Sequence, residues 1–187
     1  MRSIIPLFSF AFAASFPALA AETVPVAGFR AIELHGGGFV TVVPAPKQRI
    51  TIVEGSNAFT RFRVDREGKL RIDACAGRCP RHYRLRIRIE TPPMLALGIV
   101  GGGLIEAGPG FAPQDALGVA VHGGGKIDVR SIDAANVGAA VNGGGAIFVR
   151  ARRSLGAAVK GGGEIRYWGS PVVATSINGG GIVRPAT

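Results

Sequence analysis

The sequence predicts an all-β protein, in which a strand-rich first section precedes a parallel β-helix-like solenoid. Three observations support this prediction. Triple glycines recur at short intervals in the second half of the chain, β-branched residues flank them, and the first half alternates apolar with charged residues. The repeat of 18–22 residues is too short for a strand–helix–strand unit of roughly 30 residues, but it fits one coil of a stack.

Six glycine triplets occur, and the last five begin 22, 20, 18 and 18 residues apart. An apolar residue stands two positions before each of these five triplets, and another stands two positions after it. In a strand this spacing points both side chains inward, from Ile99 and Ile105 in the first repeat to Ile177 and Val183 in the last. Glycine suits a corner that needs positive φ or close backbone contact. The predicted structural glycines are Gly36, Gly37, Gly38, Gly101, Gly102, Gly103, Gly123, Gly124, Gly125, Gly143, Gly144, Gly145, Gly161, Gly162, Gly163, Gly179, Gly180 and Gly181.

The N-terminus has the layout of a secretory signal peptide: one arginine, an apolar run and Ala18-Leu19-Ala20. We assign residues 1–20 to the signal peptide, with cleavage after Ala20, and residues 21–27 to a linker. No later stretch is long and apolar enough to cross a bilayer, so no transmembrane segment is expected after cleavage. The protein is predicted to be periplasmic, cell-surface or secreted.

Residues 28–95 form the strand-rich first section, and residues 96–187 form the glycine-repeat section. Alternation predicts strands at 49–53, 61–64, 69–73 and 84–90, with Leu85, Ile87 and Ile89 facing inward. Thr91-Pro92-Pro93 breaks this pattern and marks the join between the sections. The first section either continues the solenoid or forms a separate small β domain.

Basic residues are concentrated in the first section. After cleavage the chain holds 21 lysines and arginines against 12 acidic residues, and residues 28–95 hold 13 against 6. Arginine suits carboxylate, sulfate and phosphate groups, so an acidic glycan or other envelope polymer is the predicted partner. Export and scarce aromatic residues argue against nucleic acid. The alternative is a solvated strand face whose charges prevent edge-to-edge aggregation. The predicted ligand-binding residues are Arg61, Arg63, Lys69, Arg71, Arg84, Arg86 and Arg88.

The two cysteines, Cys75 and Cys79, are predicted to form a disulfide in an oxidising compartment. An extended chain would hold them about 13 Å apart, but a turn at residues 76–78 brings them together. With His82 they make an incomplete metal-ligand set, because no fourth ligand is evident. No metal or cofactor is predicted.

Two motifs suggest catalysis, but the sequence evidence for each of them is weak. His122 and its glycine triplet resemble the oxyanion-hole loop of lipases, but no serine stands in the G-x-S-x-G setting that such a loop serves. Glu106 and Asp128 occupy equivalent positions in successive repeats, where a carboxylate pair would suit a polysaccharide-active enzyme. We predict no catalytic residues and keep that enzyme as the alternative function.

The glycine corners, the exported N-terminus and the stretch from Tyr167 to Pro171 together resemble the bacterial head GIN domain family, described as a putative auto-transporter adhesin. The resemblance covers roughly residues 28–185, although Gly-Ser-Gly is usual at the family's corners. It implies an all-β fold with a parallel β-helix-like region and no recognised catalytic residues. The predicted function is that of a non-enzymatic exported module of the cell envelope, with a binding or structural role that resembles that of an adhesin. Its open solenoid ends also admit a homo-oligomer.

Overall fold

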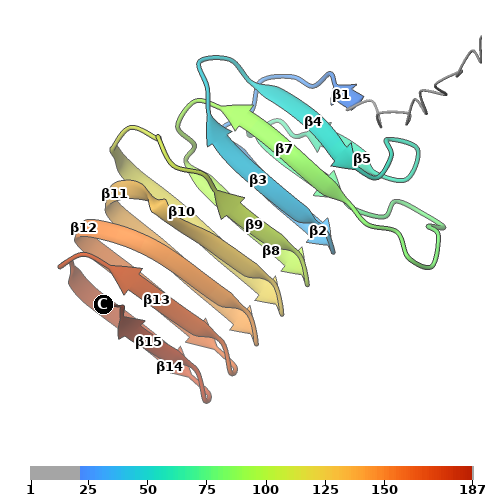
Figure 1. Cartoon of the computed structure of the whole chain (residues 1–187). Helices are drawn as coiled ribbons and strands as arrows, with labels where there is room; N and C mark the ends of the chain where they lie inside the picture. Colours follow the sequence, from blue (N-terminus) through green and yellow to red (C-terminus); the bar gives the residue numbers. More distant parts are fainter. Residues whose placement is uncertain (1–21, 187) are drawn as a thin grey trace, which may run out of the picture.

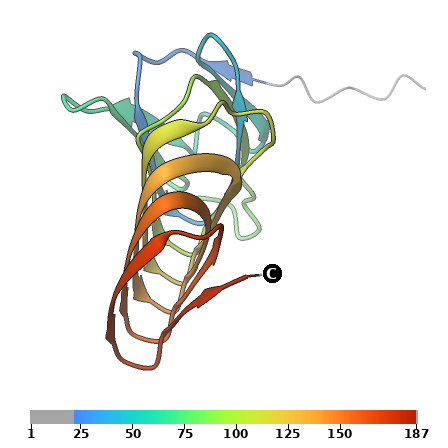
Figure 2. The same cartoon turned by 90° about the vertical axis from the view of Figure 1, so that its left-hand side faces the viewer.

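The protein is an all-β molecule in a computed structural model that describes residues 22–186. Fifteen strands in this range form one sheet, which curls back on itself (Figures 1 and 2). The all-β prediction is confirmed. The predicted signal peptide, residues 1–20 with cleavage after Ala20, lies outside the described residues. Within residues 22–186, no helix is long and apolar enough to cross a membrane.

One ladder of parallel strands is formed by the segments that precede the glycine triplets. Its order is β6, β2, β8, β10, then the second halves of β11 and β12, then β14. The bounds are β2 Ala31–Gly36, β6 Lys69–Asp73, β8 Ala96–Gly101, β10 Gln114–Gly123, β11 Lys126–Gly143, β12 Ala146–Lys160 and β14 Val172–Asn178. We call this the pre-glycine ladder.

The segments that follow the triplets form a second parallel ladder, the post-glycine ladder. Its order is β7, β3, β9, then the first halves of β11 and β12, then β13 and β15. The additional bounds are β3 Phe39–Pro44, β7 Arg86–Thr91, β9 Leu104–Ala107, β13 Glu164–Trp168 and β15 Ile182–Pro185. The long strands β11 and β12 run through both ladders, so the ladders are two sides of one sheet.

Antiparallel strands close the N-terminal end of both ladders. β5 (Arg61–Val64) pairs with β6, while β4 (Arg49–Glu54) pairs with β7 and β1 (Glu22–Val24) pairs with β4. β2 and β3 pair in turn with β8 and β9. The strands of the first section therefore continue the sheet of the glycine-repeat section.

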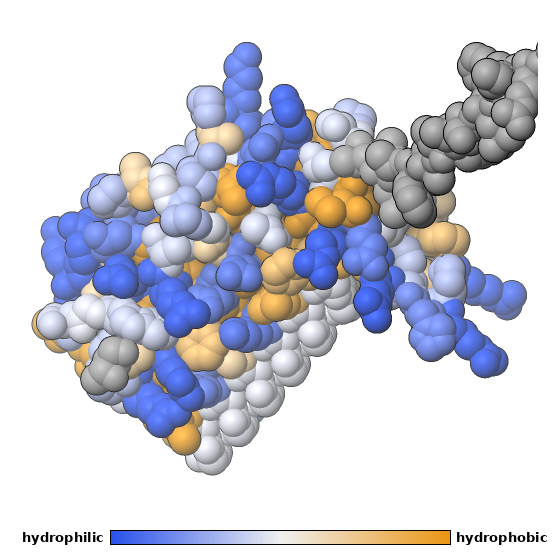
Figure 3. Space-filling view, viewed as in Figure 1, coloured by the Kyte–Doolittle hydropathy of each residue, from blue (hydrophilic) through white to orange (hydrophobic). Residues whose placement is uncertain are grey.

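The glycine triplets lie in register where the chain passes from one ladder to the other. A Cβ on Gly143 would lie 2.6 Å from the carbonyl oxygen of Gly123, and Gly143 also has a φ of +126°. A Cβ on Gly145 would lie 2.6 Å from the carbonyl oxygen of Gly125, whereas one on Gly144 would meet nothing within 4 Å. The first and third positions therefore require glycine, and the middle one does not. Figure 3 shows the triplets as a smooth pale strip along the stack.

Inward-facing aliphatic side chains of the two ladders form the core. The residues two positions from each triplet are fully or almost fully buried from Leu34 through Val159 before the triplets, and from Val40 through Ile165 after them. The last repeat differs from its prediction, because Ile177 is 47% exposed. β14 has a neighbouring strand on one side only among the described residues, so nothing covers this side chain.

Candidate anion-binding surface

The seven predicted cationic residues all lie at the N-terminal end of the stack but not on one surface. Arg61 and Arg63 are on β5, and Lys69 and Arg71 are on β6, at the end of the pre-glycine ladder. The other three residues are on β7 of the post-glycine ladder or just before it; they are Arg84, Arg86 and Arg88. Leu85, Ile87 and Ile89 are buried between them, as the alternation predicted.

The β5–β6 group is largely neutralised by its own carboxylates. Asp73 accepts hydrogen bonds from Arg63 (2.8 Å) and Arg71 (2.9 Å), while Glu33 lies 3.6 Å from the Lys69 ammonium. Burial alone would raise the pKa of Asp73, but the two guanidinium groups outweigh it and hold this pKa below its ordinary value. Only Arg61 of this group has no carboxylate within 4.0 Å among the described residues.

The two arginines on β7 are also accompanied by carboxylates, at longer distances. Arg86 lies 3.7 Å from Glu54, and Arg88 lies 3.7 Å from Glu90. The Arg86 guanidinium also stacks over the Phe39 ring, 5.0 Å from its centroid. These exposed pairs are screened by solvent and hold their partners weakly, so an external anion can compete for both arginines.

The connection between β6 and β7 carries arginines that have no acidic residue near them in sequence. Residues 74–89 contain five arginines and no acidic residue. Three of these arginines, Arg78, Arg81 and Arg84, are exposed, and none has a carboxylate within 4.0 Å in the described part of the chain. Figure 3 shows hydrophilic side chains projecting where Figure 1 places this connection. We call residues 78–86 the arginine loop.

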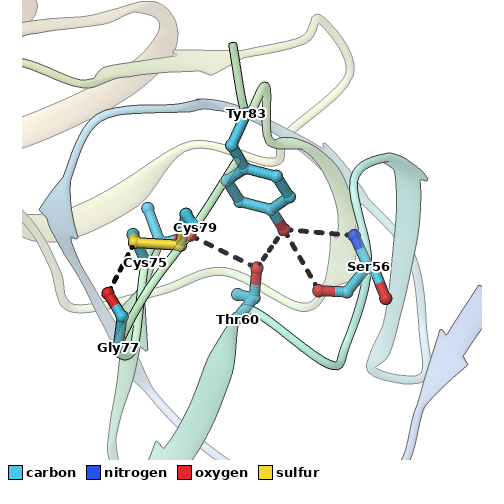
Figure 4. The surroundings of a disulfide bond; sticks show 7 residues. Ser56, Thr60, Cys75, Gly77, Cys79 and Tyr83 are labelled. Atoms are coloured by element: carbon cyan, nitrogen blue, oxygen red, sulfur yellow. Dashed lines mark hydrogen bonds between the residues drawn. A yellow bond between two sulfur atoms is a disulfide. The ribbon is translucent and has the colours of Figure 1, made fainter. Parts of the chain in front are cut away.

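Side-chain bonds hold the arginine loop against the β4–β5 connection (Figure 4). The Tyr83 hydroxyl accepts the Ser56 N–H (3.1 Å), donates to the Ser56 carbonyl oxygen (3.1 Å) and bonds the Thr60 hydroxyl (2.7 Å). The predicted disulfide is confirmed: Cys75 and Cys79 are bonded, with their Cα atoms 6.0 Å apart. Both thiols are used in that bond, so the alternative metal set with His82 has no thiolate ligands. The loop is therefore tied at two points before it reaches β7.

A cavity of about 470 Å³ opens beside the arginine loop, at the end of the glycine column. Its lining includes Gly37 and Gly38 of the first triplet, the disulfide, and the side chains of Arg81, Arg84 and Arg86. Glu54 is its one acidic lining residue. The volume is within the range of small-molecule binding sites, and the charge balance favours an anion.

A second cluster of charged and aromatic residues lies on the outer face of the post-glycine ladder. Phe148 and Trp168 pack edge to face with their centroids 6.3 Å apart. Lys126 lies over Phe148 at 4.7 Å, and Arg130 lies over Trp168 at 5.1 Å. Because their own neighbours occupy these ring faces, the cluster stabilises exposed strands and leaves little ring surface for a ligand.

The carboxylate column considered for catalysis has the predicted register. Glu106 pairs with Asp128 across β9 and β11, and Phe148, Arg166 and Arg184 continue the row. Asp128 is 7% exposed, and its carboxylate lies 3.0 Å from Arg130. This carboxylate is engaged within the protein, in contrast to a pair of acids facing an open substrate cleft.

Comparison with known proteins finds a family similar to most of the repeat section. Residues 95–171 match the family model described as "Putative auto-transporter adhesin, head GIN domain". This match confirms the resemblance to the head GIN domain family over a shorter range than the expected residues 28–185. The matched residues contain the triplets that begin at Gly101, Gly123, Gly143 and Gly161, and they contain none of the seven predicted cationic residues. No curated protein matches the chain.

Solved structures are similar to this chain over most of its length. A putative adhesin from Bacteroides fragilis NCTC 9343 is 20% identical, with a TM-score of 0.56 over 91% of this chain and 98% of that chain. A putative adhesin from Parabacteroides distasonis ATCC 8503 is 16% identical, with a TM-score of 0.45 over 89% of this chain and 96% of that chain. A putative lipid binding protein from the same strain is 16% identical, with a TM-score of 0.48 over the same shares. The first similarity supports the overall fold.

The sequence prediction included Arg84 but missed Arg78 and Arg81. It relied on strand alternation, and both missed residues lie in a loop before β7. The absence of acidic residues from 74 to 89 is the signal that would have found them. An acid-free run of that length leaves its arginines without local partners.

Proposed function

We propose that the protein is a non-enzymatic, adhesin-like binding module of the bacterial cell envelope that holds an acidic glycan at its N-terminal end. The single observation that carries this proposal is the arginine loop. Arg78, Arg81 and Arg84 are exposed and without a carboxylate partner in residues 22–186, whereas five of the seven cations predicted from strand alternation have one. An external polyanion can therefore contact the loop without first displacing an internal partner.

The proposal includes export and a scaffold role for the glycine repeats. Export follows from the N-terminal segment, residues 1–20, and places the protein in the periplasm, on the surface or outside the cell. The in-register triplets and parallel ladders support a β-solenoid with glycine corners, on which the basic end is held rigidly. The head GIN match to an adhesin-described family agrees with a binding role.

Binding of the purified protein to polygalacturonate, heparin and neutral dextran over a salt series tests the proposal. We expect saturable binding to the two acidic polymers that weakens as salt increases, because the contacts are between exposed charges. Arg81→Ser/Arg84→Ser should weaken that binding at least tenfold. The control Arg152→Ser/Arg153→Ser removes the same charge from β12 and should leave binding nearly unchanged. Equal loss in both variants, or no binding at low salt, contradicts the proposal.

The same samples test the alternative of a polysaccharide-active enzyme. If new reducing ends or unsaturated sugars are released from polygalacturonate or heparin, the proposed binding module is wrong and the enzyme is the better description. If they were released, loss of turnover in Glu106→Gln would implicate the carboxylate column. Our proposal expects binding without any such product.

We also propose that two copies associate through β14 and β15. Among the described residues each of these strands pairs on one side only, and β14 carries no charged residue. Val172, Ile177 and Ile182 are 80%, 47% and 51% exposed there. An edge strand such as β14, with apolar side chains and no charge, is a template for pairing with another strand, and a two-fold axis would pair it with itself. Sedimentation should show a dimer that Ile177→Lys converts to a monomer; a strict monomer before substitution would contradict this.

A further inference from the structure

The glycine column ends with an unused hydrogen-bond donor. In the first part of the column, the middle glycine of a triplet donates its N–H to the carbonyl oxygen of the first glycine of the triplet before it, as Gly124 does to Gly101 and Gly144 does to Gly123, both at 3.1 Å. Gly102 donates in the same way to Gly36. Gly37 is the middle glycine of the first triplet, and its N–H, like those of Gly162 and Gly180, has no backbone acceptor among the described residues. By equivalence with the other triplets, it points past the end of the column.

The cavity beside the arginine loop lies at this end of the column. Gly37 and Gly38 are part of its lining, together with Arg81, Arg84 and Arg86. The residue after the triplet, Phe39, donates its N–H to the Leu85 carbonyl oxygen at 2.8 Å, whereas the Gly38 N–H has no backbone acceptor among the described residues. The lining therefore combines two glycines whose N–H groups have no backbone acceptor with three arginines, against the single carboxylate of Glu54.

We propose that this cavity binds the phosphate monoester of a sugar, which makes it the specific subsite of the proposed glycan-binding function. Three arginines and one glutamate leave two positive charges, which match the dianion of a phosphate monoester better than the single charge of a uronic acid. Arginine forks and a backbone N–H are the donors that phosphate oxygens accept in proteins. At about 470 Å³ the cavity also has room for the sugar that carries the phosphate.

Glu54 is expected to weaken phosphate binding in the cavity. Its carboxylate lies 3.7 Å from Arg86 and faces the same cavity, so it repels an incoming phosphate while it holds the arginine. Glu54→Gln removes the repulsion and frees Arg86. The proposal therefore predicts one variant that binds more tightly as well as variants that bind less tightly.

Amide-resolved NMR with glucose 6-phosphate tests the site directly. The Gly37 N–H resonance should shift on saturable binding, with an affinity at least ten times higher than for glucuronate, inorganic phosphate or glucose. Arg81→Gln and Arg84→Gln should each weaken binding at least fivefold, and Glu54→Gln should strengthen it about threefold. Arg66→Gln, an exposed arginine of the β5–β6 turn outside the cavity, is the matched control and should change nothing.

Several outcomes would overturn the assignment. A Gly37 resonance that stays unchanged at saturation places the site elsewhere, and equal weakening by Arg66→Gln reduces the effect to net charge. If glucuronate binds as tightly as glucose 6-phosphate, the site does not require a phosphate. If inorganic phosphate binds as tightly, the site does not require the sugar. Failure of the broader function is distinguishable: glucose 6-phosphate would still shift Gly37 while neither acidic polymer binds. The reverse result, polymer binding without the shift, would retain the function and reject this subsite.

Discussion

The two ends of the sheet are built in different ways. From β8 onward, each repeat sits in register on the one before it, and backbone contacts at the glycine triplets set the spacing. At the N-terminal end, antiparallel strands close the ladders, and the chain between β6 and β7 is positioned by a disulfide and a tyrosine hydroxyl. The stack depends on residues that have no side chain, whereas the end depends on specific side-chain bonds.

This difference separates stability from recognition. In the stack, most exposed positions of the pre-glycine ladder are small, and the charged residues of the post-glycine ladder largely contact one another. At the N-terminal end the arginines of the β6–β7 connection lack such partners, and a cavity lies beside them. Recognition is therefore expected where the regular repeat stops.

The largest expected effect comes from the backbone contacts of the stack. Gly145→Ala places a Cβ 2.6 Å from the Gly125 carbonyl oxygen and 2.5 Å from a methyl group of Val121. Overpacking against rigid backbone should lower the free energy of unfolding by about 3 kcal/mol. Gly144→Ala meets nothing within 4 Å and should change it by less than about 0.5 kcal/mol. Urea unfolding measures both, and similar losses would mean that the triplets do not space the stack.

A smaller loss is expected from opening the disulfide at the other end. Cys75→Ser/Cys79→Ser removes a cross-link that closes a short loop, worth about 2 kcal/mol in the chain-entropy description. Hydrogen exchange should become faster in the arginine loop and stay unchanged in β11 and β12. Faster exchange in both regions would show that the end and the stack unfold as one unit. The wild-type protein under reducing conditions should behave as the double variant does.

Tyr83→Phe tests the second attachment of the arginine loop. The change removes a hydroxyl that bonds Ser56 and Thr60, and Thr60 is only 4% exposed. The buried Thr60 hydroxyl then keeps only its 3.5 Å bond to the Ala74 carbonyl oxygen, and the lost bonds should cost about 1–2 kcal/mol in urea unfolding. Tyr167→Phe is the matched control, because the Tyr167 hydroxyl has no hydrogen-bond partner in the described part of the chain. A larger loss at Tyr167 would be inconsistent with this bracing role.

The smallest effect is a dependence of stability on acidity at the β5–β6 corner. The Asp73 pKa is held below its ordinary value of 3.8, because hydrogen bonds from Arg71 and Arg63 outweigh burial. A lowered pKa stabilises the folded state above the unfolded-state value, and this contribution is lost as pH falls through the folded-state value. Asp73→Asn should therefore flatten the fall in urea midpoint below about pH 4. The control is Asp115→Asn, at an exposed residue without an ion pair in residues 22–186. It should not change the dependence of the urea midpoint on pH.

Much of the strand structure follows from the sequence, because alternation and glycine spacing are local signals. The alternation of Leu85, Ile87 and Ile89 with arginines predicted both the strand and its buried face. The spacing of Cys75 and Cys79 predicted their bond once a turn was assumed. Both features depend on neighbours within a few residues along the chain.

The candidate site was only partly predictable, because it depends on which strands become neighbours. Alternation placed Arg71 and Arg88 on outward faces, but it did not show that their strands end different ladders. It also did not show that Asp73 neutralises Arg63 and Arg71, since one of these contacts crosses between strands. The cavity joins Gly37 to Arg84 across nearly fifty residues of sequence, a distance over which no local pattern operates.

The middle glycines of the triplets form a row of positions along the stack at which chemical labels could be attached. A Cβ at Gly102, Gly124, Gly144, Gly162 or Gly180 meets nothing within 4 Å. Neighbouring parallel strands lie about 4.8 Å apart, so cysteines introduced at two of these positions would hold a pair of spin labels or dyes at separations that grow in steps of one strand. The same protein could then calibrate distance measurements on a scale set by its own backbone.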